Sequence, residues 1–203
     1  MPLAHKAQFG EHIFHVWENV YEPAEDSFLF AENLQLDEGD RVVDIGTGCG
    51  ILGIIAAERA REVLAVDVNP YAVGCAKENA ELNGVSDKMS FIQGDLFASI
   101  ESEVKFDLIL FNAPYLPSDP AEDTLWFERA WSGGVAGREI IDRFIRESAK
   151  HVMQNGRILL MQSSLSNINE TLRSFEQLDL KADVAVKLDL FFETVVLIEA
   201  RLG

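Results

Sequence analysis

Hydrophobic residues along this chain form short apolar runs that alternate with stretches of helical spacing. The runs that have the length and near-continuous apolar character of buried strands are Arg41 to Ile45, Val63 to Val68, Met89 to Gln93, Phe106 to Phe111 and Arg157 to Met161. Apolar residues between them recur every three or four positions, which predicts helices over 51–60, 70–83, 140–152 and 166–178. This alternation is typical of an α/β fold with parallel strands.

Turn and cap residues support several of these boundaries. Asn69 and Pro70 have the residue types expected at the cap and first position of a helix, and glycine at position 84 predicts its end. Asn155-Gly156 predicts a turn into the strand that starts at Arg157.

The chain ends in two further apolar runs, Ala182 to Leu188 and Thr194 to Ile198. The interval between them is too short for a helical crossover, so we expect them to pair antiparallel. Nothing marks a domain boundary, and residues 1–203 are therefore predicted to form a single domain. Residues 115–136 interrupt the regular pattern and contain Trp126 and Trp131, which predicts a substrate loop.

Composition restricts the class of function. The chain has 34 acidic and 17 basic residues, a formal net charge of −17, which argues against tight binding to nucleic acid. No segment has the length of a membrane span or the apolar core of a signal peptide. The cysteines, Cys49 and Cys75, and the four histidines match no metal-binding spacing. We therefore expect a cytoplasmic protein without a metal site.

The first predicted strand runs into a glycine-rich loop, Asp44-Ile45-Gly46-Thr47-Gly48-Cys49-Gly50. Residues 48–53 satisfy a dinucleotide-binding fingerprint, and Asp67 follows at the spacing of a ribose-binding carboxylate. The loop alone therefore suits a nicotinamide-dependent oxidoreductase as well as a methyltransferase. Asp44 favours the methyltransferase, because its carboxylate repels a pyrophosphate and attracts the cationic methionine end of S-adenosylmethionine. Bracing of the loop is the alternative role for Asp44.

Acidic residues also end the next two predicted strands. Asp67 follows the second, where its two oxygens can accept hydrogen bonds from both ribose hydroxyls. Asp95 follows the third and can accept from an adenine amino group, while Leu96 covers the ring. Any one of these acids could be an ordinary cap, but three in register after successive strands favour a cofactor site.

The fourth predicted strand is followed by Asn112-Ala113-Pro114-Tyr115. This motif resembles the Asn-Pro-Pro-Tyr motif of class I methyltransferases that act on planar amide or amino nitrogens. Together with segments 20–27 and 131–139, it is similar to the archaeal and eukaryotic branch of the HemK family, the glutamine methyltransferases of translation release factors. The resemblance spans residues 17–200.

The resemblance implies a Rossmann-like class I methyltransferase three-layer sandwich, with a mostly parallel seven-stranded sheet and a terminal antiparallel strand. The implied reaction is methylation of the glutamine side chain in a Gly-Gly-Gln motif. Asn112 and the carbonyl of residue 113 would accept the amide N–H bonds, and Tyr115 would stack on the planar group beside Pro114. Ala113 replaces the first proline of the family motif, which leaves the loop less stiff.

Residues 1–36 would form an N-terminal cap over the cofactor in this family. The implied contacts of S-adenosylmethionine are Tyr21, Ser27, Asp44, Gly46, Gly48, Gly50, Asp67, Val68, Asp95, Leu96 and Asn112. Expected partners are a release factor as substrate and a small zinc-binding activator subunit, for which the strand edge around Phe91 is the predicted contact. Alternatives are an adenine-N6 or protein-lysine methyltransferase, and a non-catalytic S-adenosylmethionine-binding protein with the same fold.

Overall fold

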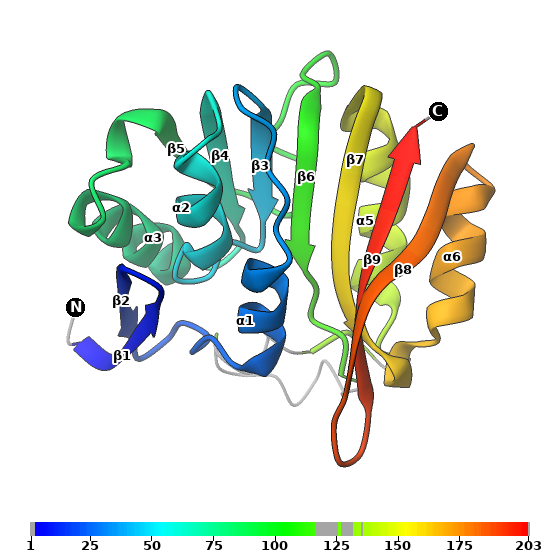
Figure 1. Cartoon of the computed structure of the whole chain (residues 1–203), viewed down its shortest axis with the longest axis horizontal. Coiled ribbons are helices and arrows are strands. Elements are labelled where there is room, and N and C mark those ends of the chain that lie inside the picture. Colours follow the sequence, from blue (N-terminus) through cyan, green and yellow to red (C-terminus); the bar gives the residue numbers. More distant parts are fainter. Residues whose placement is uncertain (1–2, 117–125, 127–131, 135, 203) are drawn as a thin grey trace. The chain divides into compact units, whose positions relative to one another are not determined.

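A computed structural model describes residues 3–116, 126, 132–134 and 136–202. The chain divides into two compact units, Met1–Ser99 and Ile100–Gly203. The strands of the main sheet follow the order β5-β4-β3-β6-β7-β9-β8 (Figure 1). This is the predicted mostly parallel seven-stranded sheet, and helices flank it. Among the described residues, every helix is too short or too polar to span a bilayer.

The first unit contains three parallel strands that carry the glycine loop. They are β3 (Arg41–Ile45), β4 (Glu62–Asp67) and β5 (Met89–Gln93). Helices α2 (Ile51–Ala57) and α3 (Pro70–Leu82) pack against these strands, and α1 (Glu25–Glu32) packs against α2. The register places the carboxyl ends of all three strands at one edge, where ligands of α/β sheets bind.

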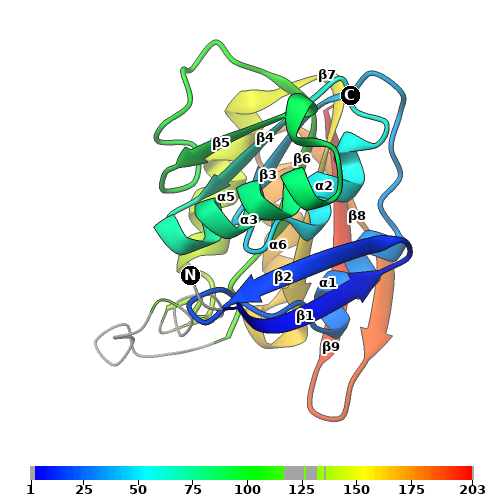
Figure 2. The same cartoon turned by 90° about the vertical axis from the view of Figure 1, so that its left-hand side faces the viewer.

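An N-terminal hairpin, β1 (Leu3–Phe9) and β2 (His12–Trp17), was not among the elements predicted from the sequence. It lies alongside α3 (Figure 2), held by the side chains of Asn79 in that helix and of Asn83, the C-cap residue of the helix. The Asn79 amide accepts from the backbone N–H of His15 and donates to its carbonyl, each at 2.8 Å. Asn83 forms the same pair with Ile13 at 3.1 and 2.9 Å. The helix thus presents amides that bond to β2 as a neighbouring strand would.

The second unit consists of β6 (Phe106–Asn112), β7 (Val152–Ser163), β8 (Leu180–Asp189) and β9 (Thr194–Leu202). Strands β6 and β7 are parallel, whereas β9 pairs antiparallel with both β7 and β8, as expected for the last two strands. Helices α5 (Glu139–His151) and α6 (Ile168–Glu176) lie side by side on this sheet. Three-residue 3₁₀ turns cover Ser86–Lys88 and Ser164–Ser166, one in each unit.

The predicted turn at Asn155-Gly156 is instead an irregularity inside β7. Strand β7 begins at Val152, which pairs with Phe106, and the register shifts before Leu108 pairs with Arg157. Asn155 has a φ of 64°, a left-handed conformation that asparagine tolerates better than most residues. Asn155-Gly156 therefore forms a bulge where a turn was predicted, because apolar residues on both sides of the pair belong to the sheet.

Candidate active site

The three loop glycines Gly46, Gly48 and Gly50 have φ angles of 67°, 57° and 90°. Other L-amino acids rarely adopt this left-handed region, so the backbone itself requires glycine at alternate positions. A Cβ at Gly50 would also lie 3.1 Å from the Cβ of Ala76, whereas no described atom lies within 4 Å of one at Gly48. Gly50 therefore packs against α3, and Gly48 leaves a surface that a ligand can approach closely.

Asp44 is buried beneath this loop and braces it. Its Oδ2 accepts hydrogen bonds from Thr47 Oγ1 at 2.6 Å and from the Gly53 N–H at 3.0 Å. Burial raises the pKa of Asp44 to about 7, against the lowering effect of these two hydrogen bonds. The bracing role left open by the sequence is thus present in the structure. Direct contact of Asp44 with the cofactor stays a prediction.

Asp67, at the end of β4, links this strand to the glycine loop. One carboxylate oxygen accepts from the Gly48 N–H and the other from the Asn69 N–H, both at 2.9 Å. Burial raises the pKa of Asp67 as well. Since each carboxylate oxygen can accept more than one hydrogen bond, these contacts leave acceptor capacity for ribose hydroxyls. The neighbouring Val68 is exposed, as a side chain that covers a bound ring has to be before binding.

Asp95 and Leu96 follow β5 in a turn closed by a 3.0 Å hydrogen bond from the Ala98 N–H to the Asp95 carbonyl. Leu96 has a φ of 49°, although it carries a bulky side chain, and it is buried. Backbone strain of this kind is concentrated at functional sites. The predicted role of Leu96 against an adenine ring stays a prediction.

In segment 21–27, one carboxylate connects the predicted cofactor residues. Asp26 Oδ1 accepts from Tyr21 Oη at 3.1 Å, from the Ser27 N–H at 2.6 Å and from Ser27 Oγ at 3.2 Å. Glu25 and Asp26 lie in the first turn of α1, where the helix dipole favours acidic residues. The role of Asp26 in fixing Tyr21 and Ser27 was not predicted from the sequence.

Asn79 is a second residue that the sequence analysis missed. Besides its bonds to β2, its side-chain N–H₂ donates to the carbonyl of Cys49 at 2.8 Å, and the residue is fully buried. It therefore connects the N-terminal hairpin to the glycine loop. The available signal was an amide on the apolar side of an amphipathic helix, where such a residue needs buried partners.

In the second unit, Asn112 is the last residue of β6 and lies opposite Met161 of β7. The following Ala113 is buried, and its N–H donates to the Met161 carbonyl at 3.3 Å. Proline has no N–H and could not form this bond. Ala113 thus lacks the stiff proline ring of the related motif but forms a hydrogen bond to the neighbouring strand β7. Pro114 and Tyr115 follow and are partly exposed.

The segment after the predicted substrate loop returns to this motif. Leu116 forms a bridge with Ser132, and the Gly133 N–H donates to the Leu116 carbonyl at 2.8 Å. At Gly134 φ is 84°, and a Cβ there would overlap the Glu139 carboxylate. The Glu139 N–H in turn donates to the Gly133 carbonyl at 3.0 Å. The glycines of this segment therefore allow a tight fold beside the acceptor motif.

Arg138 connects this segment to the residues around the start of α6. Its guanidinium donates to the carbonyl of Ser166, to that of Asn167 at 2.9 Å and to Thr171 Oγ1 at 3.0 Å. It also pairs with the Asp142 carboxylate at 2.6 Å. The predicted substrate loop is only partly described: Trp131 and residues 117–125, 127–130 and 135 lie outside the described residues.

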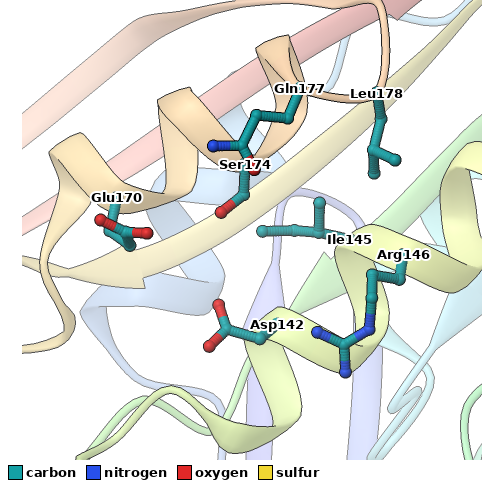
Figure 3. Close-up of a pocket in the computed structure, with 7 residues that line it drawn as sticks. All are labelled: Asp142, Ile145, Arg146, Glu170, Ser174, Gln177 and Leu178. Carbon is teal, nitrogen blue, oxygen red and sulfur yellow. The ribbon is translucent and has the colours of Figure 1, made fainter.

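A groove of about 380 Å³ lies between α5 and α6, and Figure 3 shows the side chains around it. Its lining is mostly polar: Asp142, Ile145, Arg146, Glu170, Ser174, Gln177 and Leu178. Asp142 is engaged by Arg138. None of the predicted site residues lines this groove.

Potential metal ligands and the two cysteine thiols are further candidates for a reactive site. Within the described part of the chain, no group of three or more His, Cys, Asp or Glu side chains could hold a metal ion. Cys49 and Cys75 are buried, and burial raises the pKa of the Cys75 thiol to about 11. Both thiols are protonated near neutral pH.

Comparison with known proteins places these features in a family. Residues 21–128 match the Methyltransferase small domain. A putative protein N5-glutamine methyltransferase of Methanocaldococcus jannaschii is 42% identical over 183 residues, which cover 89% of this chain and 91% of the relative. The Methyltransferase HEMK2 of Mus musculus is 28% identical over 83% of each chain.

Solved structures agree. In the E. cuniculi Mtq2-Trm112 complex, described as responsible for methylation of the eRF1 translation termination factor, the similar chain is 25% identical. The TM-score is 0.71, with 91% of this chain and 99% of that chain covered. The tRNA m1G37 methyltransferase of M. jannaschii, at 20% identity and a TM-score of 0.72, shares the fold over 98% of this chain and 56% of its own. Together with the Asn112 motif and the glycine loop, these likenesses show that the chain belongs to the HemK family of class I methyltransferases.

Proposed function

We propose that this chain transfers a methyl group from S-adenosylmethionine to the side-chain amide nitrogen of a glutamine, in the Gly-Gly-Gln motif of a translation release factor. The arrangement that carries the proposal is Asn112-Ala113 at the carboxyl end of β6, anchored to β7 through the Ala113 N–H. Supporting it, the M. jannaschii relative is named for protein N5-glutamine methylation, and the E. cuniculi complex for methylation of a termination factor.

The glycine loop fits the cofactor that the family uses. Gly48 leaves an open approach, Asp67 holds the Gly48 peptide and keeps acceptor capacity, and Val68 is exposed beside it. S-adenosylmethionine supplies an electrophilic methyl group on a sulfonium when bound. We assign its binding to Tyr21, Ser27, Asp44, Gly46, Gly48, Gly50, Asp67, Val68, Asp95, Leu96 and Asn112.

Asn112 and Ala113 have to make a poor nucleophile reactive. An amide nitrogen is unreactive because its lone pair is delocalised into the carbonyl. The Asn112 side-chain oxygen and the Ala113 carbonyl each accept one N–H of the substrate amide, which moves electron density onto the nitrogen and fixes its direction. Tyr115 closes one side of the planar group. Positioning of this kind can lower a barrier by up to about 7–11 kcal/mol. No general base is needed, because the methylated nitrogen is acidic and loses its proton to water.

A small partner subunit forms part of the proposal. Strand β5 ends the strand order of the sheet, and no strand of the described residues pairs with its outer edge. Phe91 and Ile92 on β5 are partly exposed. The E. cuniculi chain is described in complex with Trm112. We propose a small zinc-binding activator at the β5 edge. A chain that is monodisperse, stable and fully active without a partner would contradict this proposal.

The deciding experiment is mass spectrometry of the release factor glutamine after incubation with the chain, S-adenosylmethionine and any activator subunit. Asn112→Ala is expected to lower methyl transfer by about 100- to 1,000-fold, since one preorganised hydrogen-bonding group is lost. Asn155→Gly, at the other end of β7, is the control and should retain full activity. A wild-type chain that binds the cofactor but modifies no glutamine would refute the proposal, and an active Asn112→Ala chain would refute the role of Asn112.

A further inference from the structure

The turn between β8 and β9 carries two aromatic side chains that are almost fully exposed. Phe191 and Phe192 have exposed fractions of 91% and 87%, and their rings meet edge to face with centroids 4.6 Å apart. The Leu190 N–H donates to the Glu193 carbonyl at 2.8 Å, which closes the hairpin around the two phenylalanines. Polar residues and glycine dominate such turns, so this pair is unusual.

Two more exposed apolar residues adjoin the turn. Leu190 precedes Phe191, and Leu165 lies in the 3₁₀ turn at the base of the hairpin, where the Thr194 N–H donates to Ser164 Oγ at 3.0 Å. We call Leu165, Leu190, Phe191 and Phe192 the apolar tip. Side chains left in water at this turn contribute almost nothing to folding, whereas burial against another molecule would stabilise a complex.

The register of the second unit places the apolar tip at the same edge as the acceptor motif. Asn112 lies opposite Met161, and Met161 lies opposite Leu197 of β9. From Leu197 the antiparallel strand continues past this edge to Phe192, five positions further on. Figure 1 shows the β8–β9 hairpin extending beyond the end of β7 in this direction.

Strand geometry gives the reach of the tip. Five positions at about 3.3 Å each put Phe192 about 17 Å past the level of Asn112 along the strand direction. A hexapeptide with its glutamine at the centre extends only about 10 Å to either side. A molecule that contacts Asn112 and the apolar tip together therefore has to be larger than the modified sequence, as a folded protein is.

Charge narrows the class of molecule further. Asp189 and Glu193 flank the tip, and the whole chain has a net charge of −17. Anionic membrane surfaces repel such a region. A protein surface with an apolar pocket and basic residues at its rim is complementary to it.

We propose that the apolar tip is a docking element for the folded protein substrate, which it binds through an apolar pocket while the target glutamine reaches Asn112. This inference rests on the proposed function and adds a second contact to it. Phe191 and Phe192 insert into the pocket, and Leu165 and Leu190 cover its margin.

The test compares Phe191→Ser/Phe192→Ser with the wild-type full chain on two substrates, folded release factor and a Gly-Gly-Gln hexapeptide. We expect kcat/KM for the folded protein to fall about 10- to 100-fold, mainly through KM, as for the loss of two interface anchors. Transfer to the hexapeptide and affinity for S-adenosylmethionine should stay within twofold. Phe191→Leu/Phe192→Leu should recover most of the loss. Met153→Ser, an exposed apolar residue at the other end of β7, is the matched control.

Several results would overturn the inference. Equal losses on both substrates would mean that the turn supports the fold of the site, and no loss on either would mean that the substrate docks elsewhere. A wild-type dimer that the double substitution dissociates, or phenylalanine-dependent binding to phosphatidylserine vesicles, would assign the tip to a second copy or to a membrane. Failure of the wild-type chain to methylate either substrate would instead count against the proposed function, before any variant is compared.

Discussion

The glycine loop of the first unit and the acceptor motif of the second are held in different ways. Asp44, the first residue of the loop, accepts hydrogen bonds from Thr47 in the loop and from Gly53 in α2, and Asp67 at the end of β4 accepts one from Gly48. The acceptor motif is instead anchored by β7 through the Met161 carbonyl and by a segment that returns from residue 132.

The difference is between bracing by the strands that carry the site and bracing by a segment that returns to it. A loop braced by carboxylates at the ends of β3 and β4 keeps its shape wherever those strand ends are intact. A motif held by a segment some twenty residues away can change its substrate when that segment changes. Substitutions in the segment that holds the acceptor motif should therefore affect substrate turnover. Substitutions in the glycine loop should affect cofactor binding.

The largest effect is expected from Arg138→Ala. The side chain is nearly buried and bonds to three groups near α6 and to Asp142, so its removal takes a donor from the buried residues Ser166 and Thr171. We expect about 2–4 kcal/mol less free energy of unfolding and slower methyl transfer, with unchanged S-adenosylmethionine affinity. Denaturant unfolding and calorimetry measure these quantities. Arg173→Ala, an exposed arginine 4.0 Å from Glu170, should cost less than about 0.5 kcal/mol.

Gly48→Ala tests whether the glycine loop controls cofactor binding. Gly48 and Gly84 both have left-handed φ, 57° and 72°, and at both a Cβ would meet no described atom within 4 Å. Both alanine variants should therefore lose a similar free energy of unfolding, about 1 kcal/mol. Only Gly48→Ala should weaken S-adenosylmethionine binding, by about 10- to 100-fold in titration calorimetry, because its methyl group faces the ligand approach. Equal affinities in the two variants would remove Gly48 from the cofactor site.

Asp44→Asn tests the buried charge. The pKa of Asp44 is about 7 in the folded chain and 3.8 in the unfolded chain. Its contribution to the free energy of unfolding is therefore complete below pH 3.8 and is lost as the pH rises from 3.8 to 7. The loss is about 1.4 kcal/mol per pH unit. Asparagine can still accept from Thr47 and Gly53. In urea unfolding, the free energy of unfolding of the variant should rise relative to that of the wild type between pH 5.5 and 7. Above pH 7 the difference should stay constant. Parallel pH profiles would contradict the raised pKa.

The smallest effect is expected from Ala113→Pro, which restores the residue of the related motif. The ring stiffens the loop but removes the N–H that bonds to the Met161 carbonyl. These effects oppose each other, so stability should change by less than about 1 kcal/mol and kcat by less than threefold, in unfolding and single-turnover assays. A loss of activity comparable to that of Asn112→Ala would show that the anchor to β7 is essential.

Much of the fold was predictable because its signals are local. The bounds of β3 and β5 agree with the apolar runs, and the start of α3 agrees with its Asn69 cap and Pro70. The N-terminal hairpin was not predictable in the same way. Its attachment to α3 includes hydrogen bonds to Asn79 and Asn83, more than sixty positions further along the chain, and no periodicity within the hairpin records those partners.

By itself the sequence determined the α/β architecture, the glycine positions and the family motif, since each depends on residue types and spacings within a short window. Only the tertiary structure decided which acids brace the loop, that Asp26 orients Tyr21 and Ser27, and that Arg138 secures the acceptor segment. It also decided that Phe191 and Phe192 lie exposed at the edge that carries Asn112. Some of these contacts join residues distant in the chain, as Arg138 to Thr171, and others join near neighbours, as Asp26 to Ser27. In both cases strand register and burial set the geometry, which no pattern of residue types encodes.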